Sequence, residues 1–201
     1  MRFIGITGGV GAGKSELLAY IQRHYNCRIY LADEVAHLVK KKGTACYAQL
    51  VALLGQEVLQ PDGEIDKQKM AARIFGDEEL LQQVNGIIHP AVQDYILQQV
   101  ALARQDGTVE LFFVEAALLI EAGYKDLVDE LWYVYADVDA RRKRLKSARG
   151  YAADRIEGIM GNQLSEEVFR TTCDFVIDNS GELADSYRQI DKKLEAFTWR
   201  E

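Results

Sequence analysis

Cysteine and proline are scarce in this chain of 201 residues, which holds three cysteines and two prolines. Cys27, Cys46 and Cys173 lie far apart, and no CxxC pair occurs. An odd number of widely spaced cysteines excludes a disulfide framework and a zinc knuckle. This use of cysteine indicates a reducing compartment.

Long hydrophobic runs are also missing. The longest apolar stretches, residues 111–114 and 116–120, are separated by Glu115, and neither approaches the roughly 18–20 residues of a membrane helix. Near the N-terminus, the apolar residues 3–6 are too few for a signal peptide, and Lys14 interrupts the stretch after them. We therefore expect a cytoplasmic enzyme or binding protein with no membrane partner.

Positive charge is in deficit, because 24 Lys and Arg stand against 31 Asp and Glu, for a net charge of −7. Binding to a nucleic-acid backbone needs an excess of Lys and Arg on the contact face, so we expect no nucleic-acid partner. A local basic cluster can still hold a small phosphorylated ligand. The apolar fraction of 48% and the charged fraction of 27% are ordinary globular values, which exclude disordered and fibrous classes.

The apolar runs of the chain predict an α/β fold. Five short runs are expected to be strands: residues 2–7, 28–32, 109–115, 130–136 and 174–178. They are mostly continuous rather than alternating, which is typical of strands buried on both faces of a parallel sheet. Segments with helical spacing follow the first, fourth and fifth runs, at residues 14–24, 140–147 and 183–197. This alternation predicts a doubly wound α/β protein with a parallel five-stranded sheet.

One interval is too long for a simple crossover between strands. Residues 34–107 contain apolar repeats at helical spacing and a turn signal at 61–63 (PDG). Pro90 suits the first residue of a helix that runs to about Arg104. We interpret residues 34–107 as an inserted helical subdomain that binds the acceptor, and residues 1–33 with 108–201 as the nucleotide-binding core.

Residues 8–15 (GGVGAGKS) fit the pattern GxxxxGK[ST] without exception. Glycines let backbone N–H groups converge on phosphate oxygens, and the helix that begins there adds its partial positive charge. In this pattern, Lys14 reaches the β- and γ-phosphates and the Ser15 hydroxyl binds Mg²⁺. The motif follows a predicted strand and opens a predicted helix, so it predicts a nucleoside-triphosphate site.

Acidic residues follow the other predicted strands, at the sheet edge where ligands of such folds bind. Asp33 leads into the insertion, so we expect its carboxylate to orient an acceptor hydroxyl and take its proton. His37 lies one helical turn later and either helps to place the substrate or pairs with Asp33. Glu115 could hold Mg²⁺ through water. For Asp137 and Asp178, capping of a helix N-terminus is an equally good interpretation.

A basic cluster, residues 141–144 (RRKR), follows the fourth predicted strand. On a helix, Arg141 and Arg144 share a face and Arg142 points away. We interpret residues 139–172 as a lid over the nucleotide, with Arg144 and Arg149 as the arginines acting on the transferred phosphoryl group, although a solvated helix surface is the usual role of such a run. The lysines at 40–42 could hold a substrate phosphate, but a solvated helix end is favoured.

No NKxD element occurs, and the sole DxxG, residues 178–181, comes too late for a switch segment, so a GTPase is disfavoured. A small-metabolite kinase fits the length, the insertion and the basic segment. In the order and spacing of its motifs, the chain resembles the dephospho-CoA kinase family over almost its whole length. The segments that carry this resemblance are 4–15, 33–37 with Gly43, 61–66, 88–90 (IHP), 118–121 (LLIE) and 163–181.

The resemblance implies ATP-dependent phosphorylation of the ribose 3′-hydroxyl of 3′-dephospho-coenzyme A, with Mg²⁺ as cofactor. It implies that Asp33 is the base, that Asn179 lies near adenine, and that His89 either contacts the acceptor or caps a helix at Pro90. The expected catalytic residues are Asp33, Lys14, Arg144 and Arg149. The expected ATP-binding residues are Gly9, Val10, Gly11, Ala12, Gly13, Lys14, Ser15, Glu16 and Asn179, the acceptor-binding residues are Asp33, His37 and His89, and the metal-binding residues are Ser15 and Glu115.

This sequence departs from the family pattern at three places. Ala117 stands where a proline is common, Lys67 follows Asp66 where arginine is usual, and Arg144 and Arg149 are five residues apart rather than four. The spacing leaves the choice among the lid arginines open. Two alternatives also stay open: another small-metabolite or nucleoside kinase, and a nucleotide-binding regulator without catalysis.

Overall fold

The computed structural model describes residues 1–161 and 163–198, except for the side chains of residues 148, 149 and 198. The chain divides into two compact units. We call residues Met1–Ile29 with Asp106–Glu201 the sheet unit, and residues Tyr30–Gln105 the helical unit.

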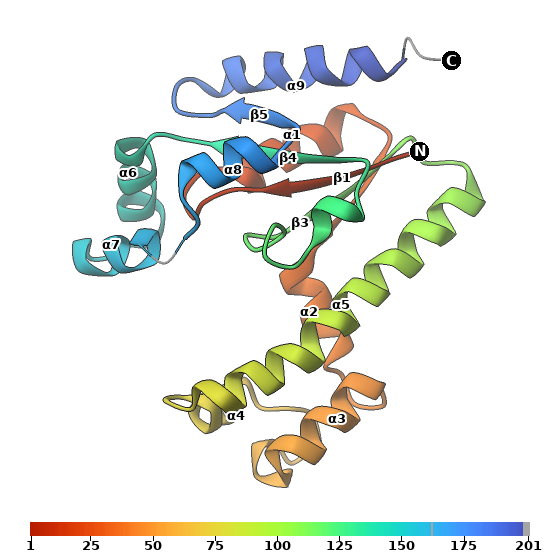
Figure 1. Cartoon of the computed structure of the whole chain (residues 1–201), viewed down its shortest axis with the longest axis vertical. Coiled ribbons are helices and arrows are strands. Elements are labelled where there is room, and N and C mark those ends of the chain that lie inside the picture. The colour runs from red at the N-terminus through yellow and green to blue at the C-terminus, as the bar shows by residue number, and fades with distance from the viewer. Residues whose placement is uncertain (162, 199–201) are drawn as a thin grey trace. The chain divides into compact units, whose positions relative to one another are not determined.

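The sheet has five strands in the order β2-β3-β1-β4-β5, and its paired strands are parallel (Figure 1). The strands are β1 (Arg2–Thr7), β2 (Cys27–Leu31), β3 (Leu111–Glu115), β4 (Glu130–Tyr135) and β5 (Phe175–Asp178). The predicted α/β class with a parallel five-stranded sheet is therefore confirmed. Strand β1 occupies the centre, so the residues directly after it lie at the middle of the sheet edge.

The three central strands form the core of the sheet unit. Ile4, Phe112, Phe113 and Trp132 are fully buried, and the rings of Phe113 and Trp132 meet edge to face with centroids 5.8 Å apart. The indole N–H of Trp132 donates to Glu130 over 2.9 Å, so this buried polar group is satisfied. Burial on both faces explains why these strands are continuous apolar runs.

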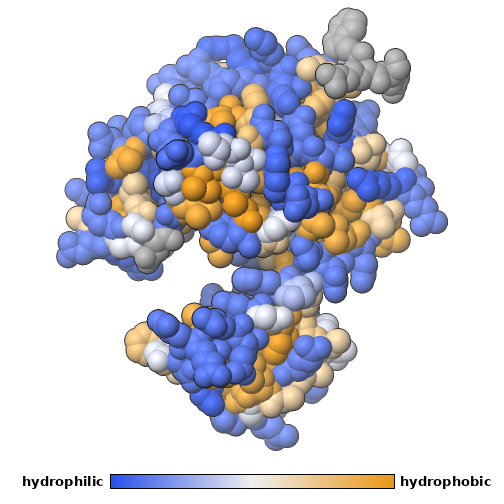
Figure 2. Space-filling view, viewed as in Figure 1, coloured by the Kyte–Doolittle hydropathy of each residue, from blue (hydrophilic) through white to orange (hydrophobic). Residues whose placement is uncertain are grey.

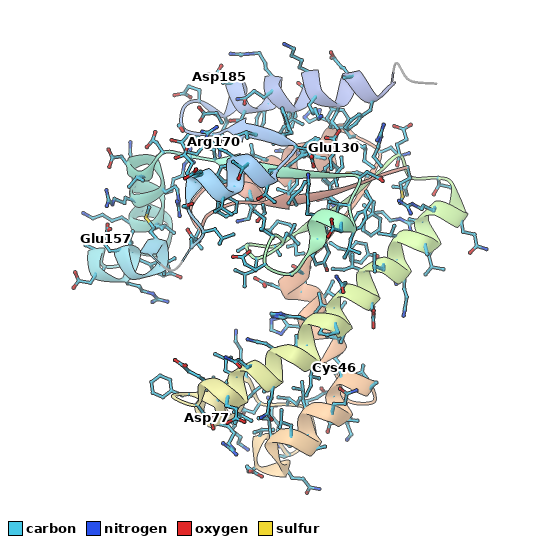
Figure 3. The ribbon with its side chains drawn as sticks, in the orientation of Figure 1. Cys46, Asp77, Glu130, Glu157, Arg170 and Asp185 are labelled. Carbon is cyan, nitrogen blue, oxygen red and sulfur yellow. The ribbon has the colours of Figure 1, made fainter. Side chains whose placement is uncertain are left out.

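The helices of the sheet unit follow its strands. They are α1 (Lys14–His24), α6 (Val138–Arg149), α7 (Ala153–Gly161), α8 (Glu166–Thr172) and α9 (Leu183–Thr198), with a short 3-10 turn at Tyr124–Asp126. Helix α9 packs on β5, α8 packs on β4, and α6 pairs with α7 (Figure 1). The Lys193 ammonium of α9 bonds to Glu130 of β4 over 2.9 Å, and Figure 3 shows Glu130 beneath that helix.

The helical unit contains α2 (Ala32–Val39), α3 (Ala45–Leu54), a 3-10 turn at Gln56–Val58, α4 (Lys67–Ile74) and most of α5 (Glu78–Asp106). Thr44 caps α3 by accepting the Tyr47 N–H, and Asp66 caps α4 by accepting those of Gln68 and Lys69. The fully buried side chains of this unit include Val35, Leu50, Leu54, Val84 and Ile96. Its core is therefore separate from that of the sheet.

The prediction that a helix begins at Pro90 is wrong. Pro90 lies inside α5, which runs unbroken for 29 residues. A proline in a helix interior costs about 3 kcal/mol because it removes one hydrogen bond and crowds the preceding turn. Val84, before the proline, and Val92 and Ile96, after it, are all buried at helical spacing, so packing along the whole helix outweighs that cost.

No helix of the described residues is long and apolar enough to cross a membrane. The visible face of the molecule is mostly hydrophilic with small apolar patches (Figure 2). Among the exposed apolar side chains, Phe75 between α4 and α5 is 90% exposed.

Candidate functional site

The glycine loop joins the central strand β1 to helix α1. Gly8, Gly11 and Gly13 adopt φ angles of +146°, +83° and +92°. A Cβ at Gly8 would lie 2.4 Å from the carbonyl oxygen of Val134, and one at Gly13 would lie 2.3 Å from Nδ2 of Asn179. Both the backbone conformation and the close contacts therefore require glycine at these positions.

Lys14 folds back over this loop. Its Nζ donates to the Gly8 carbonyl oxygen over 2.8 Å and lies 3.4 Å from Oε1 of Glu115. The two side chains are only 11% and 20% exposed. Because Glu115 ends β3, a neighbour of β1, the structure brings together two of the predicted site residues, one from the start of α1 and one from the end of β3.

Ser15 and Glu115 supply the kind of ligand atom that Mg²⁺ prefers. Ser15 is exposed in the first turn of α1, and its hydroxyl and the Glu115 carboxylate are both hard oxygen donors. Among the described residues, no group of three or more His, Cys, Asp or Glu side chains could hold a metal ion. These two residues therefore fit a Mg²⁺ ion that takes its other ligands from phosphate and water.

Two arginines of α6 bind the loop through its backbone carbonyls. Nε of Arg141 donates to Val10 over 3.0 Å, and its NH2 group donates to the Gln163 side chain. Burial lowers the pKa of Arg141 from its usual value, while the nearby Tyr133 raises it by less. Arg144 donates to the carbonyl oxygens of Asn179 over 2.8 Å and Ala12 over 3.4 Å.

The other arginines of this helix differ in position. Arg142 forms an exposed ion pair with Glu157 of α7, with Nε to Oε1 at 2.8 Å, instead of a bond to the loop. Glu157 is labelled on α7 in Figure 3. This arrangement confirms the expectation that Arg141 and Arg144 share one face of the helix and that Arg142 points away from it. The side chain of Arg149, a predicted lid arginine, lies outside the described residues.

Asn179 is the buried centre of a network behind the loop. Its side chain is 1% exposed, its Nδ2 donates to the Ala12 carbonyl oxygen over 2.7 Å, and its Oδ1 accepts from the Ser186 hydroxyl over 2.9 Å. The Asn179 N–H also bonds to Tyr135 of β4 over 2.8 Å. Ser186 and Gln163 were not identified from the sequence, because neither belongs to a phosphate-binding pattern.

Asp137 and Asp178 have local structural contacts. Oδ1 of Asp137 accepts the Ala140 N–H over 2.7 Å and caps α6. Oδ1 of Asp178 accepts the Ser180 N–H over 2.9 Å within a turn. Asp137 therefore caps a helix, as one interpretation of the sequence expects, whereas Asp178 stabilises a turn.

The predicted acceptor residues belong to the helical unit. Asp33 and His37 are exposed, four residues apart on α2, so they share one face of that helix. His89 is exposed in the interior of α5. It does not cap a helix at Pro90, because α5 begins at Glu78.

A parallel sheet whose central strand runs through a GxxxxGKS loop into a helix defines a nucleotide-binding protein of the phosphate-loop kinase class. Within that class, the family model "Dephospho-CoA kinase" matches residues 2–185. The chain belongs to the dephospho-CoA kinase family, and the predicted family is confirmed.

Individual relatives match along nearly their whole length. The dephospho-CoA kinase of Shouchella clausii is 33% identical over 187 residues, covering 93% of this chain and 94% of the relative. A crystal structure of a Thermus thermophilus protein covers 97% of both chains with a TM-score of 0.79 and 25% identity. The dephospho-CoA kinase from Campylobacter jejuni shares the fold, with a TM-score of 0.73 at 20% identity over 97% of this chain and 96% of that one.

Proposed function

We propose that this protein transfers the γ-phosphoryl group of ATP to the ribose 3′-hydroxyl of 3′-dephospho-coenzyme A, giving coenzyme A and ADP. The match of the dephospho-CoA kinase family model to residues 2–185 carries this proposal. The intact phosphate loop, with Lys14 folded over it, supports catalysis rather than a regulatory role without turnover.

The nucleotide is proposed to bind along residues 9–16. Backbone N–H groups of the loop and the N-terminus of α1 would hold the phosphates. Lys14 would exchange its bond to the Gly8 carbonyl oxygen for phosphate oxygens, since its ammonium is already inside the loop. Mg²⁺, held by Ser15 and through water by Glu115, would neutralise charge on the phosphates.

Asp33 is proposed as the base. The residue follows β2 by two positions, and ligands of open parallel sheets bind at the carboxyl ends of the strands. The 3′ oxygen forms a bond to the γ-phosphorus, the bond from that phosphorus to the β–γ bridging oxygen breaks, and ADP leaves. The hydroxyl proton passes to the Asp33 carboxylate, with His37 and His89 proposed to bind the acceptor.

Residues 139–172 are proposed as the lid, with Arg144 and Arg149 stabilising the transferred phosphoryl group. The contact of Arg144 with the carbonyl of Ala12 supports this role for Arg144, because it holds the guanidinium beside the loop. We also infer that Asn179 lies near adenine, and that the protein is cytoplasmic, which its free cysteines support.

A direct assay tests the reaction. Purified protein with ATP, Mg²⁺ and dephospho-coenzyme A should form coenzyme A and ADP in equal amounts, detected by mass spectrometry. Lys14→Ala should abolish most of this activity, since the loop loses the cation that faces the phosphates. A wild-type preparation that binds ATP but forms no coenzyme A would refute the proposal.

A further inference from the structure

The helical unit contains a pocket with a volume of about 110 Å³. It lies among α2, the turn before α4, and α4 itself. His37, Lys40, Glu64, Ile65, Lys67 and Met70 line it. All of these residues belong to one compact unit, so the pocket does not depend on the rest of the chain.

The pocket lining is rich in basic groups. Lys40, Lys67 and His37 line the pocket together with one carboxylate, that of Glu64. The Glu64 oxygens accept the backbone N–H of Lys42 at 3.1 and 3.4 Å, so this carboxylate already has a partner. The pocket therefore offers positive charge to an anion.

Lys40 is the most informative group in this pocket. It is half-buried, and burial lowers its pKa from the usual value; the charge of Lys67 lowers it further, while Cys46 and Asp33 oppose this shift. Within residues 1–161 and 163–198, no carboxylate lies within ion-pair distance of Lys40 or Lys67. Lys67 is exposed, but the half-buried Lys40 has only one carboxylate, the more distant Asp33, to offset its burial, so a bound anion would stabilise its ammonium further.

Other lysines of this unit are bound differently. The Lys42 ammonium donates to the Asp62 carbonyl oxygen over 3.1 Å, and that of Lys69 donates to the Leu59 carbonyl oxygen over 2.6 Å. Lys41 is exposed. Residues 40–42 follow α2, as the interpretation of a helix end expects, but Lys40 is half-buried and lines the pocket, whereas Lys41 is exposed.

The position of Lys40 at the C-terminal end of α2 connects the pocket to the proposed acceptor. Asp33 and His37 stand at i and i+4 on α2, and Lys40, at i+7, is the C-cap residue directly after the helix, so the three follow one face. At about 1.5 Å per residue, Asp33 and Lys40 are roughly 10 Å apart along the axis. The acceptor carries its 3′-hydroxyl and its 5′-diphosphate on the same ribose. Asp33 can therefore meet the hydroxyl while Lys40 meets the diphosphate of the same molecule.

We propose that this pocket binds the diphosphate of dephospho-coenzyme A, with Lys40 and Lys67 as its main contacts. The proposal rests on the proposed function. Charge-assisted bonds from two ammonium groups select a doubly charged diphosphate over an uncharged nucleoside. The pocket therefore determines specificity for the diphosphate-bearing acceptor rather than taking part in phosphoryl transfer.

Kinetics of Lys40→Met test the assignment, because methionine keeps an apolar stem and removes only the charge. The KM for dephospho-coenzyme A should rise at least about tenfold, while kcat changes less than threefold. The loss should be specific, so kcat/KM for adenosine, which bears the same hydroxyl without the diphosphate, should fall less than threefold. Lys41→Met is the matched control, and its KM should stay within twofold of wild type.

A footprint of Lys40 gives a readout that does not depend on turnover. At pH 8, acetylation of Lys40, measured by mass spectrometry, should be slowed at least threefold by dephospho-coenzyme A and by inorganic pyrophosphate, but not by adenosine. Acetylation of Lys41 should not respond. The lowered pKa of Lys40 leaves more of its amine free to react.

Three results would contradict the assignment of this pocket to the diphosphate. Equal effects of Lys40→Met and Lys41→Met on KM, or no protection of Lys40 by dephospho-coenzyme A, would overturn the assignment. Protection by pyrophosphate alone would show an anion site separate from the acceptor. If the wild type forms no coenzyme A, the proposed function fails, and protection of Lys40 still decides the pocket by itself.

Discussion

Around the phosphate loop, the side chains of the sheet unit bond to one another and to the loop backbone, whereas the predicted acceptor residues of the helical unit are exposed. Lys14, Arg141, Arg144 and Asn179 each donate to a loop carbonyl oxygen or to a residue that does. Asp33, in contrast, is an exposed residue in the first turn of α2. The side chains around the phosphate loop are thus fixed by bonds within the sheet unit.

This difference has a physical origin. Triphosphate binding needs several backbone N–H groups in a strained, glycine-rich conformation, which persists only if surrounding bonds fix it. A base needs a free carboxylate that can reach a hydroxyl, and water can solvate it until the acceptor arrives. We therefore expect substitutions near the loop to reduce both stability and activity, and substitutions of the exposed acceptor residues to affect activity alone.

Asp33→Asn gives the largest expected effect and the sharpest form of this comparison. The amide keeps the shape of the side chain but cannot accept the hydroxyl proton, so kcat should fall about 10²- to 10⁴-fold. The Kd for ATP and the melting temperature should remain those of the wild type, because the residue is exposed. Calorimetry measures the Kd and the melting temperature, and single-turnover kinetics measure the rate of phosphoryl transfer. Full activity in this variant would remove Asp33 from the mechanism.

Arg144→Ala should have the next largest effect. Loss of its guanidinium removes the bonds to the Asn179 and Ala12 carbonyl oxygens and, in the proposed reaction, a cation beside the phosphoryl group. We expect kcat/KM for ATP to fall about 10²- to 10³-fold.

Arg142→Ala is the matched control on the same helix. Its side chain forms only an exposed ion pair with Glu157 and Asp139, so its kcat/KM should change less than threefold. Equal losses in the two variants would mean that the helix as a whole, and not its loop-facing side, determines activity.

Gly13→Ala tests the strain in the loop. The φ of +92° disfavours any Cβ, and the new atom would push against Nδ2 of Asn179, which is buried and bonded on both sides. We expect a loss of about 2–3 kcal/mol in the free energy of unfolding, together with weaker ATP binding. Urea unfolding measures the first quantity and calorimetry the second.

Gly107→Ala isolates the conformational part of that cost. Gly107 has a φ of +69°, and a Cβ there meets nothing within 4 Å. The Gly107→Ala variant should lose about 1 kcal/mol in the free energy of unfolding, and its ATP binding should be unchanged. A Gly13 variant no less stable than the Gly107 variant would show that Asn179 can move freely.

Much of the sheet unit could be predicted from the sequence because its signals are local. The GxxxxGKS pattern specifies the loop, and the buried apolar runs specify the strands to within two residues of their ends. Pro90 was misplaced because the preference of proline for a first turn is local, whereas the packing of Val84 and Ile96 that holds α5 together is not.

Contacts between distant segments were beyond the reach of the sequence. Ser186 bonds to Asn179, and Gln163 bonds to Arg141, but no pattern marks Ser186, and the family-like segment 163–181 predicts no role for Gln163. The pocket at Lys40 is lined by residues from α2, α4 and the turn before α4, so a run of three lysines did not identify which of them is half-buried. Such residues depend on tertiary packing rather than on spacing.

Ser186→Ala should have the smallest effect among the site variants, and it tests whether support behind the loop reaches the nucleotide. The hydroxyl donates to Oδ1 of Asn179 and to the Asp178 carbonyl oxygen, both within 3.0 Å, and it is fully buried. Its loss should cost about 1–2 kcal/mol of unfolding free energy and raise the KM for ATP a few fold, with kcat retained. Ser147→Ala is the control, since that exposed hydroxyl donates to the Arg144 carbonyl oxygen of its own helix, far from Asn179 in the sequence. If Ser186→Ala lowers stability but leaves the KM for ATP unchanged, the Asn179 network supports the fold of the sheet unit and not the geometry of its phosphate loop.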